Sequence, residues 1–152
     1  MRLFTLIILF VLPLGVFAQQ KVVEKDGKFV DEKGNLFTGT HKELFEDGTI
    51  KSEMPIANGV LNGEVKIYFK SGKINEIRTY SNGEKDKKWE TWNEAGKKLS
   101  EANFVMGKKS GKWFVWDENG TLRYDMEYLN GDKKGTWIIY DEKGNLVSKK
   151  EY

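Results

Sequence analysis

Glycine recurs at intervals of 24 residues through most of this 152-residue chain. The first column consists of Gly48, Gly72, Gly96, Gly120 and Gly144. The second consists of Gly59, Gly83, Gly107 and Gly131, and the third of Gly39, Gly63, Lys87, Gly111 and Gly135. Three columns in one phase indicate a repeat array, in which each unit buries its apolar side chains against its neighbours.

Two short segments lie between the glycines of each unit. The first is rich in aromatic and β-branched residues, as in Lys112-Trp-Phe-Val-Trp116, which is typical of strands. The second alternates apolar and polar residues, as in residues 122–128, and a period of two predicts a strand with one covered face. Asp-Glu-Asn-Gly120 and Asp-Glu-Lys-Gly144 favour tight turns between the two segments. Each unit is therefore a predicted β-hairpin.

The predicted fold is an all-β, elongated and twisted antiparallel meander. Five 24-residue hairpin repeats occupy residues 39–152, and residues 19–38 form an N-terminal cap segment. Within that segment, residues 29–37 look like a shortened turn unit that caps the first edge. In the third unit, Lys98 stands where other units have Ile or Leu, and Leu99 follows it. A slip of one residue would turn side chains to the wrong face, so a bulge is expected between Gly96 and Ser100.

Residues 1–18 have the order of a secretory signal peptide. Met1-Arg2 is basic, Leu3–Leu14 is almost entirely apolar, and Val16 and Ala18 are the small residues that a signal peptidase reads. An uncleaved membrane anchor is the alternative, but the apolar stretch is shorter than the roughly 20 residues that a spanning helix needs. We expect export to the periplasm or the exterior.

Composition excludes several classes of function. The chain has no cysteine, which excludes disulfides, a thiol nucleophile and thiolate metal sites. Its formal charge of +2 falls to +1 when Arg2 leaves with the signal peptide, so there is no global electrostatic reason to bind nucleic acid.

Aromatic residues fall into three columns that should run as rows across the sheet. These are Trp89, Trp113 and Trp137; Tyr68, Trp92, Trp116 and Tyr140; and Tyr80, Phe104, Tyr128 and Tyr152. The second row is offset by three residues from the first, so either both faces of the sheet carry rings or a bulge turns one set round. Lysines form a further column in the loops between hairpins, namely Lys85, Lys109 and Lys133.

The motifs Phe37-Thr-Gly39, Asn-Gly-x-x-x-Gly-x-Trp-x-x-Trp/Tyr and Asp-Glu-x-Gly-x-Leu resemble the MORN-repeat variant, the repeat of YwqK-type antitoxin proteins of toxin–antitoxin systems. The resemblance covers residues 29–152. It implies a β-hairpin array and a role as an antitoxin component. Protein scaffolding and membrane-lipid contact are associated with the broader MORN class. The resemblance implies no catalytic set.

Isolated polar residues have simpler explanations than catalysis or metal binding. His41, the only histidine, occupies the column of Trp89, so we expect it to pack. The acidic pairs Glu46-Asp47, Asp117-Glu118 and Asp141-Glu142 fall in turns, and each offers too few oxygens for a calcium loop. We therefore expect no enzyme activity, no cofactor and no metal.

The leading functional hypothesis is non-enzymatic binding of a protein partner, such as a toxin that acts outside the cytoplasm. The alternative is a structural module of the cell envelope that contacts polysaccharide or anionic lipid. Trp92, Trp116 and Tyr140 are the candidate contact residues of an uncovered ring face. Lys85, Lys109 and Lys133 are candidates for a basic rim that assists encounter.

We expect the mature protein to begin at Gln19, because Val16 and Ala18 fit the cleavage rule. Intact-mass measurement of exported material checks this, and a retained Met1 would contradict it.

Overall fold

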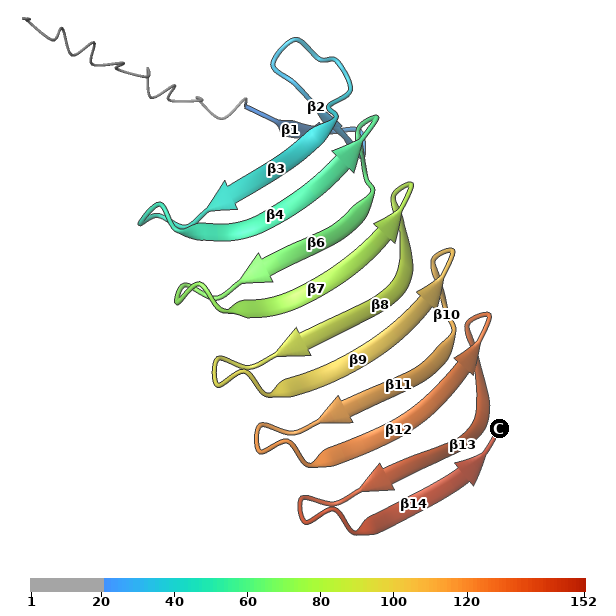
Figure 1. Ribbon diagram of the computed structural model, residues 1–152. Helices are drawn as coiled ribbons and strands as arrows, with labels where there is room; N and C mark the ends of the chain where they lie inside the picture. Colours follow the sequence, from blue (N-terminus) through green and yellow to red (C-terminus); the bar gives the residue numbers. More distant parts are fainter. Residues whose placement is uncertain (1–20) are drawn as a thin grey trace, which may run out of the picture.

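The computed structural model describes residues 21–152, so the expected signal peptide at 1–18 lies outside the described residues. The strands are β1 (Val23–Lys25), β2 (Lys28–Val30), β3 (Gly39–Leu44), β4 (Ile50–Ala57), β5 (Val60–Leu61), β6 (Gly63–Tyr68), β7 (Ile74–Ser81), β8 (Glu84–Trp92), β9 (Lys98–Val105), β10 (Lys108–Lys109), β11 (Gly111–Trp116), β12 (Leu122–Leu129), β13 (Asp132–Tyr140) and β14 (Leu146–Glu151). Figure 1 shows the hairpins side by side from one end of the molecule to the other.

The strands form one open antiparallel sheet and one small hairpin. The 12-stranded sheet has the order β14-β13-β12-β11-β9-β8-β7-β6-β4-β3, with β10 paired to β9 and β5 paired to β4. Strands β1 and β2 pair with each other. Each strand of the large sheet thus lies beside its neighbours in sequence, which confirms the predicted all-β meander. No helix within residues 21–152 is both long and apolar enough to span a bilayer.

The turns inside the hairpins explain the first glycine column. In the fifth unit the amide of Gly144 donates to the carbonyl of Asp141, and Gly144 has a φ of 80°, which favours glycine. The Asp141 carboxylate accepts the amides of Lys143 and Asn145, each at 2.8 Å. A side chain that satisfies the turn amides in this way stabilises the turn locally.

Each of the five repeat hairpins of the large sheet carries a β-bulge at the second residue of its second strand. In the fourth unit Val115 pairs with Tyr124 and Trp116 pairs with Leu122, so Arg123 is the extra residue. Equivalent register shifts occur at Glu43/Leu44, Ile67/Tyr68, Thr91/Trp92 and Ile139/Tyr140. In these pairings the extra residue is on the second strand, so the first strand alternates regularly next to the turn, as from Trp89 to Trp92. Strands β8 and β13 are irregular only farther from the turn, where they pair with β7 and β12.

The bulge expected between Gly96 and Ser100 is present, with Leu99 as the extra residue. Its cause is not a slip at Lys98, because the other four units have the same bulge. Lys98 pairs with Trp92 in the register in which Ile74 pairs with Tyr68 in the preceding unit. The irregularity of the third unit lies elsewhere: Lys87 replaces a glycine and keeps a φ of 55°, in the region that is sterically costly for residues with a Cβ.

Turns between the hairpins link one unit to the next. Asn82 and Gly83 have φ values of 49° and 86°, as in the turns that join twisted antiparallel strands. The glycine amide then donates to a carbonyl of the preceding unit, from Gly83 to Leu61 and from Gly107 to Lys85, each at 2.8 Å. These bonds fix the position of each turn against the unit before it.

The cap segment packs on the first of these turns. The amide of Phe29 donates to the Gly59 carbonyl, and the Gly59 amide donates to the Phe37 carbonyl, both at 2.8 Å. Gly59 is buried there. Residues 29–37 therefore enclose the Asn58–Gly59 turn, which lies at the same end of the sheet as strands β3 and β4.

Because the sheet is a single layer, few side chains are fully buried. Within residues 21–152 the buried hydrophobic side chains are Val30, Ile56, Val65 and Phe104. The strand pairings place Ile56, Val65 and Phe104 on one face, which we call the ladder face. The opposite face, which carries Trp92 and Trp116, we call the stripe face.

We expect Gly59→Ala to destabilise the fold more than Gly107→Ala. The two glycines have nearly equal φ values of 75° and 78°, so the backbone strain of about 1–2 kcal/mol is common to both changes. A Cβ at Gly59 would lie 3.1 Å from the Phe29 carbonyl oxygen and 2.8 Å from Leu36 Cδ2, whereas a Cβ at Gly107 meets nothing within 4 Å. The steric overlap in Gly59→Ala should lower the free energy of unfolding by about 1–3 kcal/mol more than Gly107→Ala does. Urea unfolding of the two variants measures this difference. Equal losses for the two variants would show that the cap segment does not press on this turn.

Candidate functional site

Seven aromatic rings on the ladder face form one continuous row, which we call the ring ladder. Neighbouring centroids lie 4.9–5.2 Å apart, and the ring planes are tilted by 51–64°. The members are Tyr80, Trp89, Phe104, Trp113, Tyr128, Trp137 and Tyr152. The spacing is close to the distance of about 4.8 Å between strands, because successive strands each contribute one ring. Two of the rows expected from the sequence are therefore a single interleaved row.

The indoles of the ring ladder are held by hydrogen bonds as well as by packing. The Nε1–H of Trp89 donates to the Thr79 carbonyl at 2.9 Å. Equivalent bonds run from Trp113 to Asn103 at 3.0 Å and from Trp137 to Glu127 at 2.9 Å. A buried indole N–H requires such a partner, so the three bonds fix the orientation of the three rings.

The lysine column lies over the ring ladder and not in a separate rim. Lys85, Lys109 and Lys133 pair in register with Tyr80, Phe104 and Tyr128. Their ammonium nitrogens lie 4.4–4.6 Å from the centroids of Trp89, Trp113 and Trp137 and 4.5–5.3 Å from the next ring of the ladder. The aliphatic stems thus cover rings that have no second layer above them.

The ring ladder ends at Tyr80, and the first two units have no tryptophan to extend it. His41 and Val65 occupy the tryptophan position there, and His41 is half-buried, in register with Met54. Its Nδ1 has no hydrogen-bond partner within residues 21–152.

The second aromatic row is on the stripe face, and we call it the ring stripe: Tyr68, Trp92, Trp116 and Tyr140. Strand β8 has no inserted residue between Trp89 and Trp92, so their offset of three places them on opposite faces. Trp116 packs on Phe114 with centroids 5.6 Å apart. Of the two alternatives that the sequence leaves open, the structure shows that both faces carry rings.

Two equivalent apolar clefts accompany the ring stripe. One, of about 360 Å³, is lined by Gly48, Thr49, Ile50, Glu53, Tyr68 and Gly72. The other, of about 340 Å³, is lined by Lys73, Ile74, Ile77, Trp92 and Gly96, which stand 24 positions after their counterparts. The sequence reasoning missed the isoleucines, although the 24-residue equivalence of Ile50 and Ile74 was a usable signal.

Glu53, the acidic residue of the first cleft, bonds to two neighbouring side chains of the sheet. The Tyr68 hydroxyl donates to Glu53 at 2.8 Å, and Lys42 forms an ion pair with Glu53 at 2.7 Å. Burial, together with the hydrogen bond to Glu53, raises the pKa of Tyr68 to about 12. The hydrogen bonds from Lys42 and Tyr68 lower the pKa of Glu53. These bonds fix the Tyr68 ring at the cleft wall.

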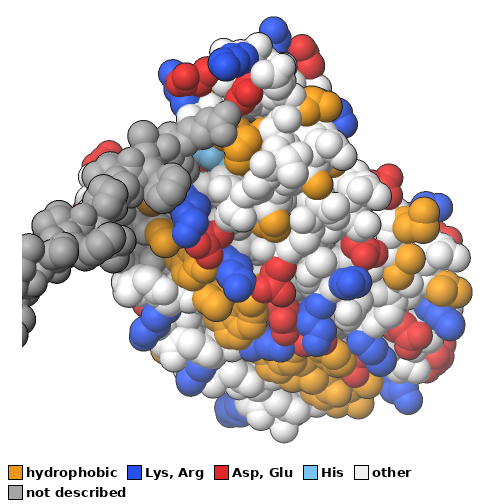
Figure 2. All heavy atoms as spheres, turned by 45° about the horizontal axis from the view of Figure 1, so that its top comes forward, with side chains coloured by type: hydrophobic (Ala, Val, Ile, Leu, Met, Phe, Trp, Pro, Cys, Tyr) orange, Lys and Arg blue, Asp and Glu red, His pale blue; other side chains and the backbone are white. Residues whose placement is uncertain are grey.

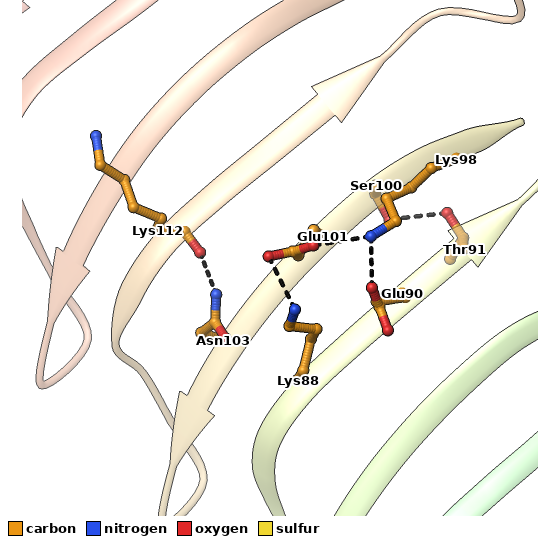
Figure 3. A network of polar contacts seen from close by, with 8 residues as sticks. All are labelled: Lys88, Glu90, Thr91, Lys98, Ser100, Glu101, Asn103 and Lys112. Atoms are coloured by element: carbon orange, nitrogen blue, oxygen red, sulfur yellow. Dashed lines mark hydrogen bonds and ion pairs between the residues drawn. The ribbon is translucent and has the colours of Figure 1, made fainter. Parts of the chain in front are cut away.

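In the third unit a charge network replaces the aliphatic lining (Figure 3). Lys98 bonds to Glu90 and, at 2.9 Å, to Glu101, and Lys88 lies 3.4 Å from Glu101. Burial opposes the charge of Lys98, but the bonds to Glu90 and Glu101 outweigh it, so the pKa of Lys98 is raised. The same bonds overcome burial at Glu101 and lower its pKa. The network explains how a lysine is accommodated in the Ile/Leu column.

Charged and hydrophobic side chains alternate on the molecular surface, where Figure 2 shows hydrophobic bands between Lys/Arg and Asp/Glu side chains. The turn aspartates serve the backbone: hydrogen bonds from Thr121 and Asn119 lower the pKa of Asp117, although burial acts against them. Within residues 21–152, no group of three or more His, Asp or Glu residues is arranged to hold a metal ion.

The structure separates the six sequence-derived candidates into two sets. Trp92, Trp116 and Tyr140 lie on the stripe face, and Lys85, Lys109 and Lys133 lie over the ring ladder on the other face. A single partner surface therefore cannot engage both sets face-on. Whether either set binds a partner stays a prediction.

A family model for the MORN repeat variant matches residues 61–82, 109–130 and 133–152. The repeat type that the sequence resembles is thereby confirmed at three places in the chain. No curated protein matches. The crystal structure of the GtfA/B complex bound to UDP and GlcNAc is similar with 12% identity and a TM-score of 0.29. That match covers 93% of this chain and 25% of the other, and so low a TM-score bears on neither fold nor function.

We expect Trp113→Ala to destabilise the protein more than Trp116→Ala. Trp113 contacts the rings of Phe104 and Tyr128 and donates a hydrogen bond, so its loss should cost about 3–5 kcal/mol. Trp116 has one ring neighbour, and its loss should cost about 1–2 kcal/mol. Denaturant unfolding of both variants decides this. A larger loss of unfolding free energy in Trp116→Ala than in Trp113→Ala would mean that the ring stripe, not the ring ladder, is the core.

Proposed function

We propose that this protein is a non-enzymatic binding protein whose ring stripe contacts a protein partner. The observation that supports this most is the pair of equivalent apolar clefts beside Tyr68 and Trp92. Within residues 21–152, no second layer packs on the sheet. An apolar surface of this kind usually marks an interaction site. The three matches to the MORN repeat variant agree with a repeat module built for binding.

The ring stripe has the composition and extent of an interface centre. Trp and Tyr are the residues that most often dominate binding energy, because they bury a large area at a low cost in side-chain entropy. Four rings, each two strands from the next, extend over about 30 Å. The clefts between them can receive apolar side chains of a partner.

We also propose that the protein is exported and acts as an immunity-like protein against a toxin outside the cytoplasm. Two sequence features support this: the signal-peptide order of residues 1–18, and the resemblance to the repeats of YwqK-type antitoxins. The proposal assigns no reaction, cofactor or metal to the chain. Its partner is a protein, and the ring stripe is the surface that recognises it.

The experiment compares capture of the partner by the wild-type mature protein and by three variants. Tagged protein retrieves its partner from the periplasmic or secreted fraction, and the retrieved protein is identified and purified. We expect Trp92→Ala and Trp116→Ala to weaken binding to it by at least about tenfold, as at energetically dominant interface residues. The Lys109→Ala, Lys133→Ala double variant should change affinity far less.

Salt and folding provide the controls. Apolar contacts should survive 1 M salt, where the Debye length is about 3 Å, whereas contacts between exposed charges should not. Circular dichroism and unfolding curves verify that each variant is folded. Loss of binding in moderate salt, with the tryptophan variants unimpaired, would place the interface on the lysines and refute the ring-stripe proposal.

A further inference from the structure

The three lysines over the ring ladder have no acidic partner. No carboxylate within residues 21–152 forms an ion pair with Lys85, Lys109 or Lys133. Two strand lysines of the stripe face behave differently, since Lys98 and Lys112 each bond to a carboxylate at 2.9 Å. The ladder face therefore presents a row of uncompensated positive charges.

The positions of these charges are fixed by the fold. The Gly107 amide donates to the Lys85 carbonyl, and the Gly131 amide donates to the Lys109 carbonyl, both at 2.8 Å. The ring ladder supports each side chain from below, and the Lys133 ammonium also bonds to the Tyr152 hydroxyl at 3.3 Å. Equivalent residues lie two strands apart, so the ammonium groups recur every 9–10 Å or so along the row.

The fold does not need the charge at this position. The corresponding residue of the first unit is Leu61, which pairs with Ile56 as Lys85 pairs with Tyr80. The Leu61 carbonyl accepts the Gly83 amide at 2.8 Å, as the Lys85 carbonyl accepts that of Gly107. An aliphatic side chain thus covers the ladder face as well as a lysine stem does. The positive charge is free for a different role.

We propose that this row binds a linear acidic polysaccharide, which runs across the strands with one carboxylate beside each ammonium group. An extended glycan chain in which the acid recurs once per disaccharide has a charge repeat close to that of the row. An extended peptide repeats its side chains on one face every 6.6–6.8 Å or so, and duplex DNA has a phosphate about every 3.4 Å along each strand. A bilayer surface offers charges in two dimensions, and a single row of three lysines meets few of them.

The polysaccharide site is independent of the proposed protein interface. It lies on the ladder face, and the ring stripe lies on the other, so one molecule could hold a polysaccharide and a protein at once. Trp92→Ala should therefore leave polysaccharide binding unchanged. Failure of one proposal does not entail failure of the other.

The test uses the mature chain and hyaluronate, an alternating polysaccharide with one carboxylate per disaccharide. In the main variant Lys85, Lys109 and Lys133 are each changed to Leu, the residue found at this position in the first unit. The control variant has Lys73→Thr, Lys97→Thr and Lys143→Asn, which also removes three charges. Each of these changes introduces the residue that another unit has at that position. The three lysines lie in the turns at the opposite end of the strands from Lys85, Lys109 and Lys133.

We expect the wild type and the control variant to bind hyaluronate in low salt, with affinities within about twofold of each other. The leucine variant should bind about tenfold more weakly, because three exposed ion pairs each contribute up to a few-fold in affinity. All binding should decline as salt increases. Calorimetry measures the affinities, and unfolding curves verify that the leucine variant is folded.

Four results would overturn the proposal. The wild type could bind hyaluronate no better than neutral dextran, or the leucine variant could bind as well as the wild type. The control variant could lose as much affinity as the leucine variant, which would show that only net charge matters. Finally, polyglutamate or phosphatidylglycerol vesicles could bind more tightly than hyaluronate through the same lysines, and the row would then serve a peptide or a membrane.

Discussion

The rings of the ring ladder pack against one another across neighbouring strands. This packing buries apolar surface that a β-sandwich would bury against its second sheet. Each tilted pair of the ring ladder contributes about 0.5–1.5 kcal/mol beyond the area it buries. A strand at the end of the row has a ring on one side only, so the gain comes from having neighbours on both sides. The 24-residue period is the physical condition for this, because only a constant unit length keeps all the rings in one row.

The bulge in every hairpin lets a thin sheet carry different chemistry on its two faces. It places the extra residue on the second strand, so the first strand alternates regularly and presents Trp113 to the ring ladder and Trp116 to the ring stripe. One face is then stabilised by rings and lysine stems. The other combines rings with ion pairs such as Lys112–Asp125, at 2.9 Å. The two faces differ in chemistry, and within residues 21–152 neither is used to pack against another layer.

Local signals in the sequence were sufficient for the hairpins but not for contacts between units. Glycine columns and alternating residues predicted the meander, because turn geometry and strand alternation depend on near neighbours in the chain. The interleaving of Trp113 with Tyr128 depends on the register across a turn, which composition does not reveal. The partners of Lys98 come from Glu90 on the adjacent strand and from Glu101, so Lys98 looked anomalous when read alone. The placement of the lysines over the ladder was missed for the same reason.

The arrangement of strands also determines how the molecule responds to tension. Strands lie across the long direction of the array, and β3 and β14 lie near its two ends (Figure 1). A force applied between the ends therefore pulls at right angles to the strands and opens backbone hydrogen bonds one after another, as in a zipper. Because each unit touches only its neighbours, a detached hairpin leaves the remaining array intact. The protein should extend in unit-sized steps under low force and shorten again by the same steps when the force is released.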